Sequence, residues 1–173
     1  MRLLPFILVL AAGAANAQVK SDWERENEER LKQSEEVVVA PPPLRRARLI
    51  ELKLEAPSDF RYFVDAQSVS VGADRIVRYT MVARSPSGVE NITFEGLRCS
   101  GEYRIYAVGL PGEGAWSGRP GDWRPVPRDA RIGQNALMRN YFCPARATAI
   151  RDAKEGVAAL QAGRHPAKEL EQY

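Results

Sequence analysis

The feature that most constrains the fold is a period of two in the apolar residues between Leu49 and Val108. Successive side chains of a β-strand point to opposite faces, so this alternation is typical of half-buried strands. Short stretches rich in Pro, Gly, Ser and Asp interrupt it. The pattern predicts five strands, over residues 49–55, 60–65 with an extension over 68–71, 75–84, 89–95 and 102–108.

The connections between these strands are short, which favours antiparallel pairing. Residues 85–88, Ser-Pro-Ser-Gly, have the composition of a hairpin turn, because Pro presets φ and Gly tolerates a positive φ. In the strand before this turn, one face is expected to carry Val77, Tyr79, Met81 and Ala83. In the strand after it, Ile92 and Phe94 are expected to point inward.

Beyond residue 134 the apolar spacing becomes helical. It predicts a short helix over 134–142 and a last helix over 145–162, which Gly163 and Pro166 end. Strands followed by helices on one chain predict an α+β domain. We expect an antiparallel sheet of about five strands with the C-terminal helices packed on it, plus an N-terminal helical arm.

The N-terminus has the pattern of an export signal. A basic start and an apolar run precede Ala15-Asn16-Ala17, so cleavage is predicted after Ala17, with a signal peptide over 1–17. The apolar run holds about 13 residues, whereas a membrane-spanning helix needs roughly 20. We therefore predict no transmembrane span after cleavage; an uncleaved anchor is the alternative.

The remaining chain divides into three parts. Residues 18–43 are expected to form a helical arm, which starts at the capping box of Ser21 and Glu24, and a spacer with three consecutive prolines. The arm is either a solvated helix or docks on a partner. The globular domain is expected over 44–163, and a polar tail over 164–173.

The chain contains two cysteines, Cys99 and Cys143. In an exported protein they favour a disulfide, because the compartment outside the membrane is oxidising. The closed loop of about 45 residues would stabilise the fold by roughly 4 kcal/mol in the chain-entropy account. The alternative is a free catalytic thiol, but the two cysteines lack the Cys-x-x-Cys arrangement that lowers a thiol pKa.

Residues 109–131 are rich in Gly and Pro and are expected to form a long loop, and loops of this length tend to be functional. They carry the candidate binding residues Trp116, Arg119, Trp123 and Arg124. Either both rings pin the loop to the sheet, or they form an aromatic and guanidinium surface for a sugar, a peptide or an envelope polymer.

The sequence contains no recognisable catalytic motif. His165 lies in the polar tail, where we expect it to be exposed, and two Cys with one His are too few for a zinc site of four such ligands. We predict no cofactor and no metal. Lys and Arg number 25 against 22 acidic residues, a mixture of charges that favours no nucleic-acid partner. Glu95 and Asp122 remain candidates for a pair of catalytic carboxylates.

Several stretches carry a family pattern: residues 78–91, the run Phe-Glu-Gly-Leu-Arg-Cys over 94–99, Tyr-Ala over 106–107, the two loop tryptophans, and Tyr-Phe-Cys over 141–143. Together they resemble the CNP-like family of small exported proteins of beta-proteobacteria. The resemblance covers roughly 45–150. It implies a periplasmic location in a Gram-negative envelope and carries over no catalytic residue.

The sequence therefore favours a non-enzymatic binding or interaction module of the cell envelope, with an envelope protein or polymer as its partner. The alternative is a hydrolase that acts on an envelope polymer through paired carboxylates.

Overall fold

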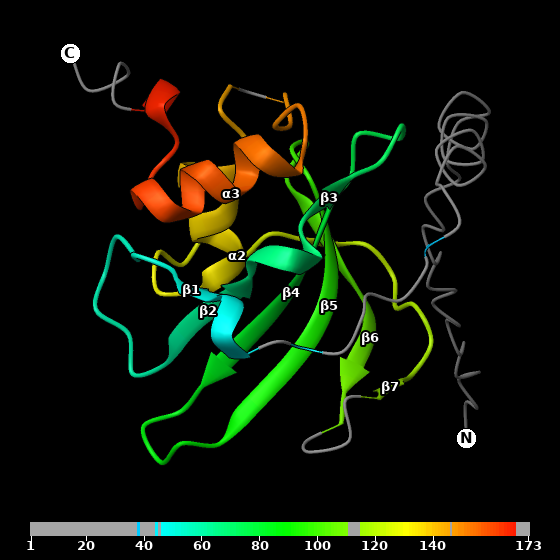
Figure 1. Ribbon diagram of the computed structural model, residues 1–173, viewed down its shortest axis with the longest axis vertical. Helices are drawn as coiled ribbons and strands as arrows, with labels where there is room; N and C mark the ends of the chain where they lie inside the picture. Colours follow the sequence, from blue (N-terminus) through cyan, green and yellow to red (C-terminus); the bar gives the residue numbers. More distant parts are fainter. Residues whose placement is uncertain (1–37, 39–43, 45, 111–114, 146, 169–173) are drawn as a thin grey trace, which may run out of the picture. The chain divides into compact units, whose positions relative to one another are not determined.

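The computed structural model describes residues 38, 44, 46–110, 115–145 and 147–168 (Figure 1). The predicted signal peptide and, apart from Val38, the predicted arm lie outside the described residues. In the described part of the chain, no helix is both long enough and apolar enough to cross a membrane.

The core of the fold is one antiparallel sheet of eight strands (Figure 1). Six of them follow one another across the sheet in the order β1 (Leu49–Glu51), β2 (Arg61–Asp65), β4 (Val77–Arg84), β5 (Glu90–Arg98), β6 (Glu102–Gly109) and β7 (Trp116–Ser117). In addition, β3 (Ser70–Val71) pairs with β4, and β8 (Arg124–Pro125) pairs with β6. The expected number of about five strands was too low, because β3, β7 and β8 have two residues each and are too short to show an alternation.

The turn between β4 and β5 forms as predicted. Gly88 has a φ of +85°, and its N–H donates to the carbonyl oxygen of Ser85 over 2.9 Å. The strand boundaries differ more: β1 ends at Glu51 and not at residue 55, whereas β5 continues to Arg98. Residues 109–131, predicted as an unstructured loop, contain β7 and β8.

The helical part consists of α2 (Gly133–Ala136), which continues as the π-helical turn η3 (Leu137–Phe142), and of α3 (Ala153–Ala162). The last helix begins eight residues later than predicted, because the Asp152 carboxylate caps it by accepting the Glu155 N–H over 2.9 Å. Gly163 ends it with a φ of +79°. Three short 3₁₀ turns complete the structure: η1 (Arg46–Arg48), η2 (Ala66–Ser68) and η4 (Pro166–Lys168).

The main hydrophobic core lies between the sheet and these helices. As expected, Val77, Tyr79 and Met81 of β4 belong to it. From the helical side it includes the fully buried Leu137, Tyr141, Phe142, Ile150 and Leu160. Figure 1 shows α2 and α3 gathered over one end of the sheet, whereas none of the described helices covers the end with the β4–β5 hairpin. We call the side of the sheet that packs on α2 and α3 the helix face.

The opposite face of the sheet is also buried. Ile92 and Phe94 point inward as predicted, but on the side away from the helices, where Ile92 packs with Phe63 and Val82 in a second cluster and Phe94 packs on Trp116. Leu44, Leu49 and Trp116 cover that cluster. Because apolar residues therefore occupy both faces, the alternation in β5 does not reveal which face the helices cover. It is Thr93 and Glu95 that point to the helix face, where both contact other side chains of that face.

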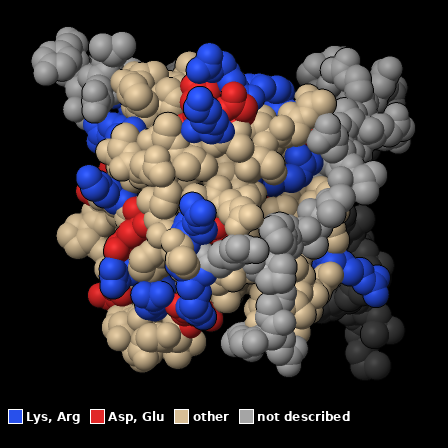
Figure 2. Space-filling view, in the orientation of Figure 1, with Lys and Arg blue, Asp and Glu red and all other residues tan. Residues whose placement is uncertain are grey.

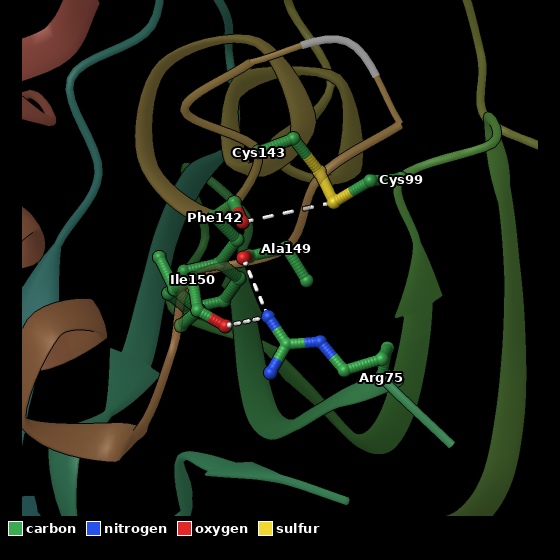
Figure 3. Close-up of a disulfide and its surroundings, with 6 residues drawn as sticks. All are labelled: Arg75, Cys99, Phe142, Cys143, Ala149 and Ile150. Atoms are coloured by element: carbon green, nitrogen blue, oxygen red, sulfur yellow. Dashed lines mark hydrogen bonds between the residues drawn. A yellow bond between two sulfur atoms is a disulfide. The ribbon is translucent and has the colours of Figure 1, made fainter. Parts of the chain in front are cut away.

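The predicted disulfide between Cys99 and Cys143 is confirmed, with sulfur atoms 2.06 Å apart. It joins the end of β5 to the end of η3 (Figure 3). Beside it, Arg75 donates from Nη2 to the carbonyl oxygens of Ala149 and Ile150 over 2.9 and 3.0 Å. The two connections fix the segment between η3 and α3 to the sheet.

His165 is buried, not exposed as predicted, with only 7% of its surface accessible. Its backbone N–H donates to the carbonyl oxygen of Asn140 over 2.7 Å, and its Nδ1 accepts the N–H of Ala167. Its Nε2 lies 3.2 Å from a carboxylate oxygen of Glu155. The chain folds back after Gly163, which turns a residue of an apparently polar tail into an anchor for α3.

Candidate functional site

A pocket of about 360 Å³ lies on the helix face, beside α2 and towards the end of the sheet that no helix covers. Its walls come from β2 and the residue before it, from β4, β5 and β6, and from the start of α2 and the segment that leads into it: Phe60, Tyr62, Met81, Ala83, Asn91, Thr93, Glu95, Tyr103, Ile105, Pro127, Ile132 and Gln134. A second cavity of similar size shares Phe60 and Tyr62, but its other lining residues lie over 51–61. Only the first is lined by a buried carboxylate, and we call it the Glu95 pocket.

The pocket is lined by one buried carboxylate, that of Glu95, which is 1% exposed. Thr93 donates its hydroxyl to Oε1 over 2.6 Å, and Tyr79 donates its hydroxyl to Oε2 over 3.0 Å. The side-chain amide of Gln134 donates to both carboxylate oxygens, over 3.0 and 3.1 Å. Three neutral side chains therefore hold the carboxylate.

The start of α2 brings Gln134 to this position. Gly133 packs so closely on the sheet that an added Cβ would lie 2.7 Å from the ring of Tyr62 and 3.0 Å from Met81. The next residue but one, Asn135, donates its side-chain amide to the carbonyl oxygen of Pro127 over 2.7 Å. A glycine at position 133 thus lets the helix approach the sheet, and the Asn135 bond fixes the wall of the pocket that precedes it.

The pKa of Glu95 is raised, and burial is the main cause, because a carboxylate loses hydration in the protein interior. The hydrogen bonds from Thr93, Tyr79 and Gln134 oppose this rise, since they stabilise the charged form. The pKa of Tyr62 is also raised, by burial and then by the negative charges of Asp129 and Glu95. Among the described residues that line the pocket, none is Lys or Arg.

The rim of the pocket is aromatic and partly open. Phe60 is 45% exposed, and its ring centre lies 6.5 Å from that of Tyr62. Tyr103 and Ile105 of β6 are half-buried on the other side. A concave apolar site with a few converging polar groups is the usual form of a small-molecule binding site.

The two tryptophans of the predicted site both stack on the sheet. The guanidinium of Arg98 lies 3.8 Å from the ring centre of Trp123, and that of Arg104 lies 5.4 Å from it. Arg104 also donates from Nε to the carbonyl oxygen of Gly121 over 2.9 Å. The ring of Trp116 packs on Phe94, with 6.0 Å between centres. Both rings are half-buried, as the interpretation that they pin the loop to the sheet requires.

Arg119 and Arg124, the other two predicted site residues, are exposed. Arg124 pairs with Tyr103 at the edge of β6. On the face that Figure 2 shows, Lys and Arg side chains are interspersed with Asp and Glu side chains, and large areas carry neither. The described contacts of Trp116, Trp123 and Arg124 are with the sheet.

Glu95 and Asp122, the predicted pair of carboxylates, are not brought together by any contact described above. Asp122 is exposed, and the neighbouring Trp123 stacks on Arg98 and Arg104, which lie on the face of the sheet opposite to Glu95. The described hydrogen bonds of Glu95 come from neutral groups only.

Glu95 was predicted as a candidate, but as a catalytic carboxylate paired with Asp122, and the roles of Thr93 and Gln134 were not predicted. Thr93 and Glu95 lie two positions apart in β5 and so share one face of the strand. Gln134 gives no such signal, because its approach to Glu95 depends on the packing of α2 on the sheet.

A family model described as the CNP1-like family matches residues 27–161 of the chain. This match is longer at both ends than the resemblance over residues 45–150 described above. No curated protein and no solved structure matches the chain.

Proposed function

The chain belongs to the CNP1-like family, and we propose that it is a non-catalytic binding protein of the cell envelope that holds a small ligand in the Glu95 pocket. The observation that carries this proposal is the combination of a cavity of about 360 Å³, lined largely by apolar residues, with a buried carboxylate in its wall. Buried charges are costly, and groups with perturbed pKa values cluster at functional sites.

Binding fits the pocket better than catalysis. A general acid or base must reach the proton that it transfers, and a glycosidase of the usual kind needs a second carboxylate across the cleft. Glu95 is hydrogen-bonded on both oxygens by side chains of the protein, and the described contacts supply no second acid. A fixed carboxylate suits recognition of a ligand group more than turnover.

We further propose that the protein acts in the periplasm after cleavage behind Ala17. The N-terminal sequence pattern supports export, and the disulfide between Cys99 and Cys143 is compatible with an oxidising compartment. The arm over 18–43 then precedes the binding domain, and Trp116, Arg119, Trp123 and Arg124 remain candidates for a second contact with an envelope protein or polymer.

Thermal unfolding in the presence of candidate ligands tests the binding proposal. The panel contains neutral sugars, amino acids, short peptides, alkyl and aryl amines, and carboxylic acids. A ligand at one hundred times its Kd stabilises the native state by about 2.7 kcal/mol, which raises the Tm by roughly 5–10 °C for a domain of this size.

The matched variants are Ala83→Phe, which places a ring in the pocket, and Ala158→Phe, which places the same ring on the exposed side of α3. The proposal predicts that Ala83→Phe abolishes the shift caused by the ligand and that Ala158→Phe retains it. A ligand that stabilises both variants equally binds elsewhere and contradicts the proposal, as does a panel in which no compound raises the Tm.

A further inference from the structure

We propose that the Glu95 pocket binds a small primary ammonium ligand with an apolar body, and that the ammonium group replaces the amide of Gln134 on the Glu95 carboxylate. This inference rests on the proposed function and adds the chemical class of the ligand.

The first argument is the charge of the pocket. Glu95 is its only lining residue that carries a formal charge among those described, and its described hydrogen bonds come from neutral donors. Asp129, whose charge also acts on Tyr62, is already paired with Arg131 over 2.8 Å. A positive group in the pocket would therefore meet an unneutralised carboxylate, whereas an anionic ligand would meet a like charge.

The second argument is the hydrogen-bond geometry at the carboxylate. The Gln134 amide nitrogen lies 3.0 Å from one oxygen of Glu95 and 3.1 Å from the other, so a single nitrogen donates to both. A primary ammonium group can make the same two bonds from the same position. Its bonds would be charge-assisted, and such bonds are about twice as strong as those of a neutral amide.

The third argument is the access to this position. Gln134 is half-buried and comes from the start of α2, whereas Thr93 and Tyr79 reach Glu95 from the sheet itself. Among the described hydrogen-bond donors to the Glu95 carboxylate, Gln134 is thus the one that comes from outside the sheet. It can rotate away without disturbing the sheet, and Thr93 and Tyr79 would continue to hold the carboxylate.

The fourth argument is the character of the walls. Met81, Ile105, Pro127 and Ile132 offer an apolar surface to the body of the ligand. Tyr62 and Phe60 add two aromatic rings near the rim, and the face of such a ring attracts a cation. An alkyl or aryl ammonium ion combines the two properties.

Isothermal titration calorimetry with three compounds on one skeleton tests the charge requirement. The compounds are phenethylammonium, the neutral 2-phenylethanol and the anionic phenylacetate. We expect phenethylammonium to bind at least tenfold more tightly than the alcohol, and phenylacetate to show no binding. Equal binding of the alcohol, or tighter binding of the anion, overturns the inference.

Phenethyltrimethylammonium tests the hydrogen bonds, because it keeps the charge but has no N–H group to donate. We expect its affinity to be at least fivefold lower than that of phenethylammonium. Equal affinity would show recognition by the aromatic rings alone and would overturn the exchange of Gln134 for the ligand.

Three variants test the residues. Glu95→Gln keeps the size of the side chain and removes its charge, so phenethylammonium binding should fall at least tenfold. Gln134→Lys supplies an ammonium group from the chain itself and should also abolish binding, with the Tm unchanged or raised. Gln134→Ala uncovers the carboxylate and should tighten binding several-fold. Unchanged affinity in Glu95→Gln and Gln134→Lys, with a cooperative thermal transition, refutes the inference even if Gln134→Ala does not fold.

The two proposals can fail separately. If the panel described above finds a neutral or anionic ligand whose effect Ala83→Phe abolishes, the pocket is a binding site and only the ammonium inference is wrong. If no compound of the panel acts through the pocket, both are wrong.

Discussion

The two faces of the sheet differ in what contacts their buried charged side chains. On the face away from the helices, Asp74 pairs with Arg78, which also lies 5.7 Å from the ring centre of Tyr106, and the ring of Trp123 lies under Arg98. On the helix face, Glu95 is equally buried but is held by neutral donors beside a cavity. Buried charges are thus paired within the protein on one face, whereas on the other face the buried carboxylate has neutral donors, and we propose that a ligand supplies the positive charge.

The difference between the two faces favours the helix face as the ligand site. The aromatic and guanidinium groups of the 109–131 loop suggested a binding surface in the sequence, but the ring of Trp123 stacks on Arg98 and Arg104 of the protein itself. The sequence suggested Glu95 only as one of two catalytic carboxylates, whereas in the structure it lines a cavity and accepts hydrogen bonds from Gln134. Both faces can be tested by removing one charged or aromatic group at a time.

The largest effect is expected from Asp74→Ala. The side chains of Asp74 and Arg78 are 3% and 7% exposed, so the substitution leaves a buried guanidinium without its carboxylate. Breaking such a pair costs about 3–5 kcal/mol of unfolding free energy, measured by urea denaturation. The double variant Asp74→Ala with Arg78→Met should recover part of this loss. A loss below about 1 kcal/mol for Asp74→Ala would show that this face does not depend on the pair.

The next effect concerns the disulfide, which fastens the end of η3 to β5 and so holds the helices on their face of the sheet. Replacing both Cys99 and Cys143 by Ser should lower the unfolding free energy by about 2–4 kcal/mol. Chemical reduction of the unsubstituted protein should lower its unfolding free energy, measured by urea denaturation, by a similar amount. Identical midpoints for the oxidised protein and the double variant would exclude a stabilising role.

A smaller effect is expected from Trp123→Ala. The substitution removes a half-buried ring and its stacking with Arg98 and Arg104, which together stabilise the fold by about 1–2 kcal/mol. The thermal transition should remain cooperative at a lower Tm. An unchanged Tm would instead indicate that the ring serves recognition of a partner and not the attachment of the loop.

The smallest effect at neutral pH is expected from Glu95→Gln, because the variant loses a costly buried charge together with some of its hydrogen bonds. We expect a change within about 1 kcal/mol. The pH dependence is more informative. The pKa of Glu95 is raised above its ordinary value of 4.5 in the native state.

Between 4.5 and the native pKa, the native state of the unsubstituted protein therefore binds more protons than the unfolded state, and its stability decreases as the pH rises. Relative to Glu95→Gln, the unsubstituted protein should lose stability over this interval and stay constant above it. A difference between the two proteins that does not vary with pH would contradict the raised pKa.

Local patterns in the sequence predict much of the fold. The alternation in β4 identifies Val77, Tyr79 and Met81 as one buried face, and the pair of cysteines identifies the disulfide. The helical spacing places a helix that packs through Leu137 and Tyr141. These features depend on neighbouring residues, or on a residue type with a single simple pairing, and so they can be recognised without the tertiary structure.

The pocket depends on packing between distant segments and could not be predicted in this way. Gln134 lies 39 positions from Glu95 in the sequence, and the close packing of Gly133 on Tyr62 brings the two together. Both faces of the sheet are buried, and the apolar Ile92 and Phe94 of β5 lie on the face away from the helices, so the alternation alone does not show that Glu95 faces them. The burial of His165 likewise follows from a fold-back after α3 that a polar composition does not indicate.

The central claim, that the ligand occupies the helix face, is tested most directly by a ¹H–¹⁵N NMR titration with phenethylammonium. The side-chain amide of Gln134 and the indole N–H of Trp123 report on the two faces within one spectrum. We predict a saturable shift of the Gln134 amide signals, together with backbone signals of β5 around Thr93, and no shift of the Trp123 indole. A saturable shift of the Trp123 indole with stationary Gln134 signals would contradict the account.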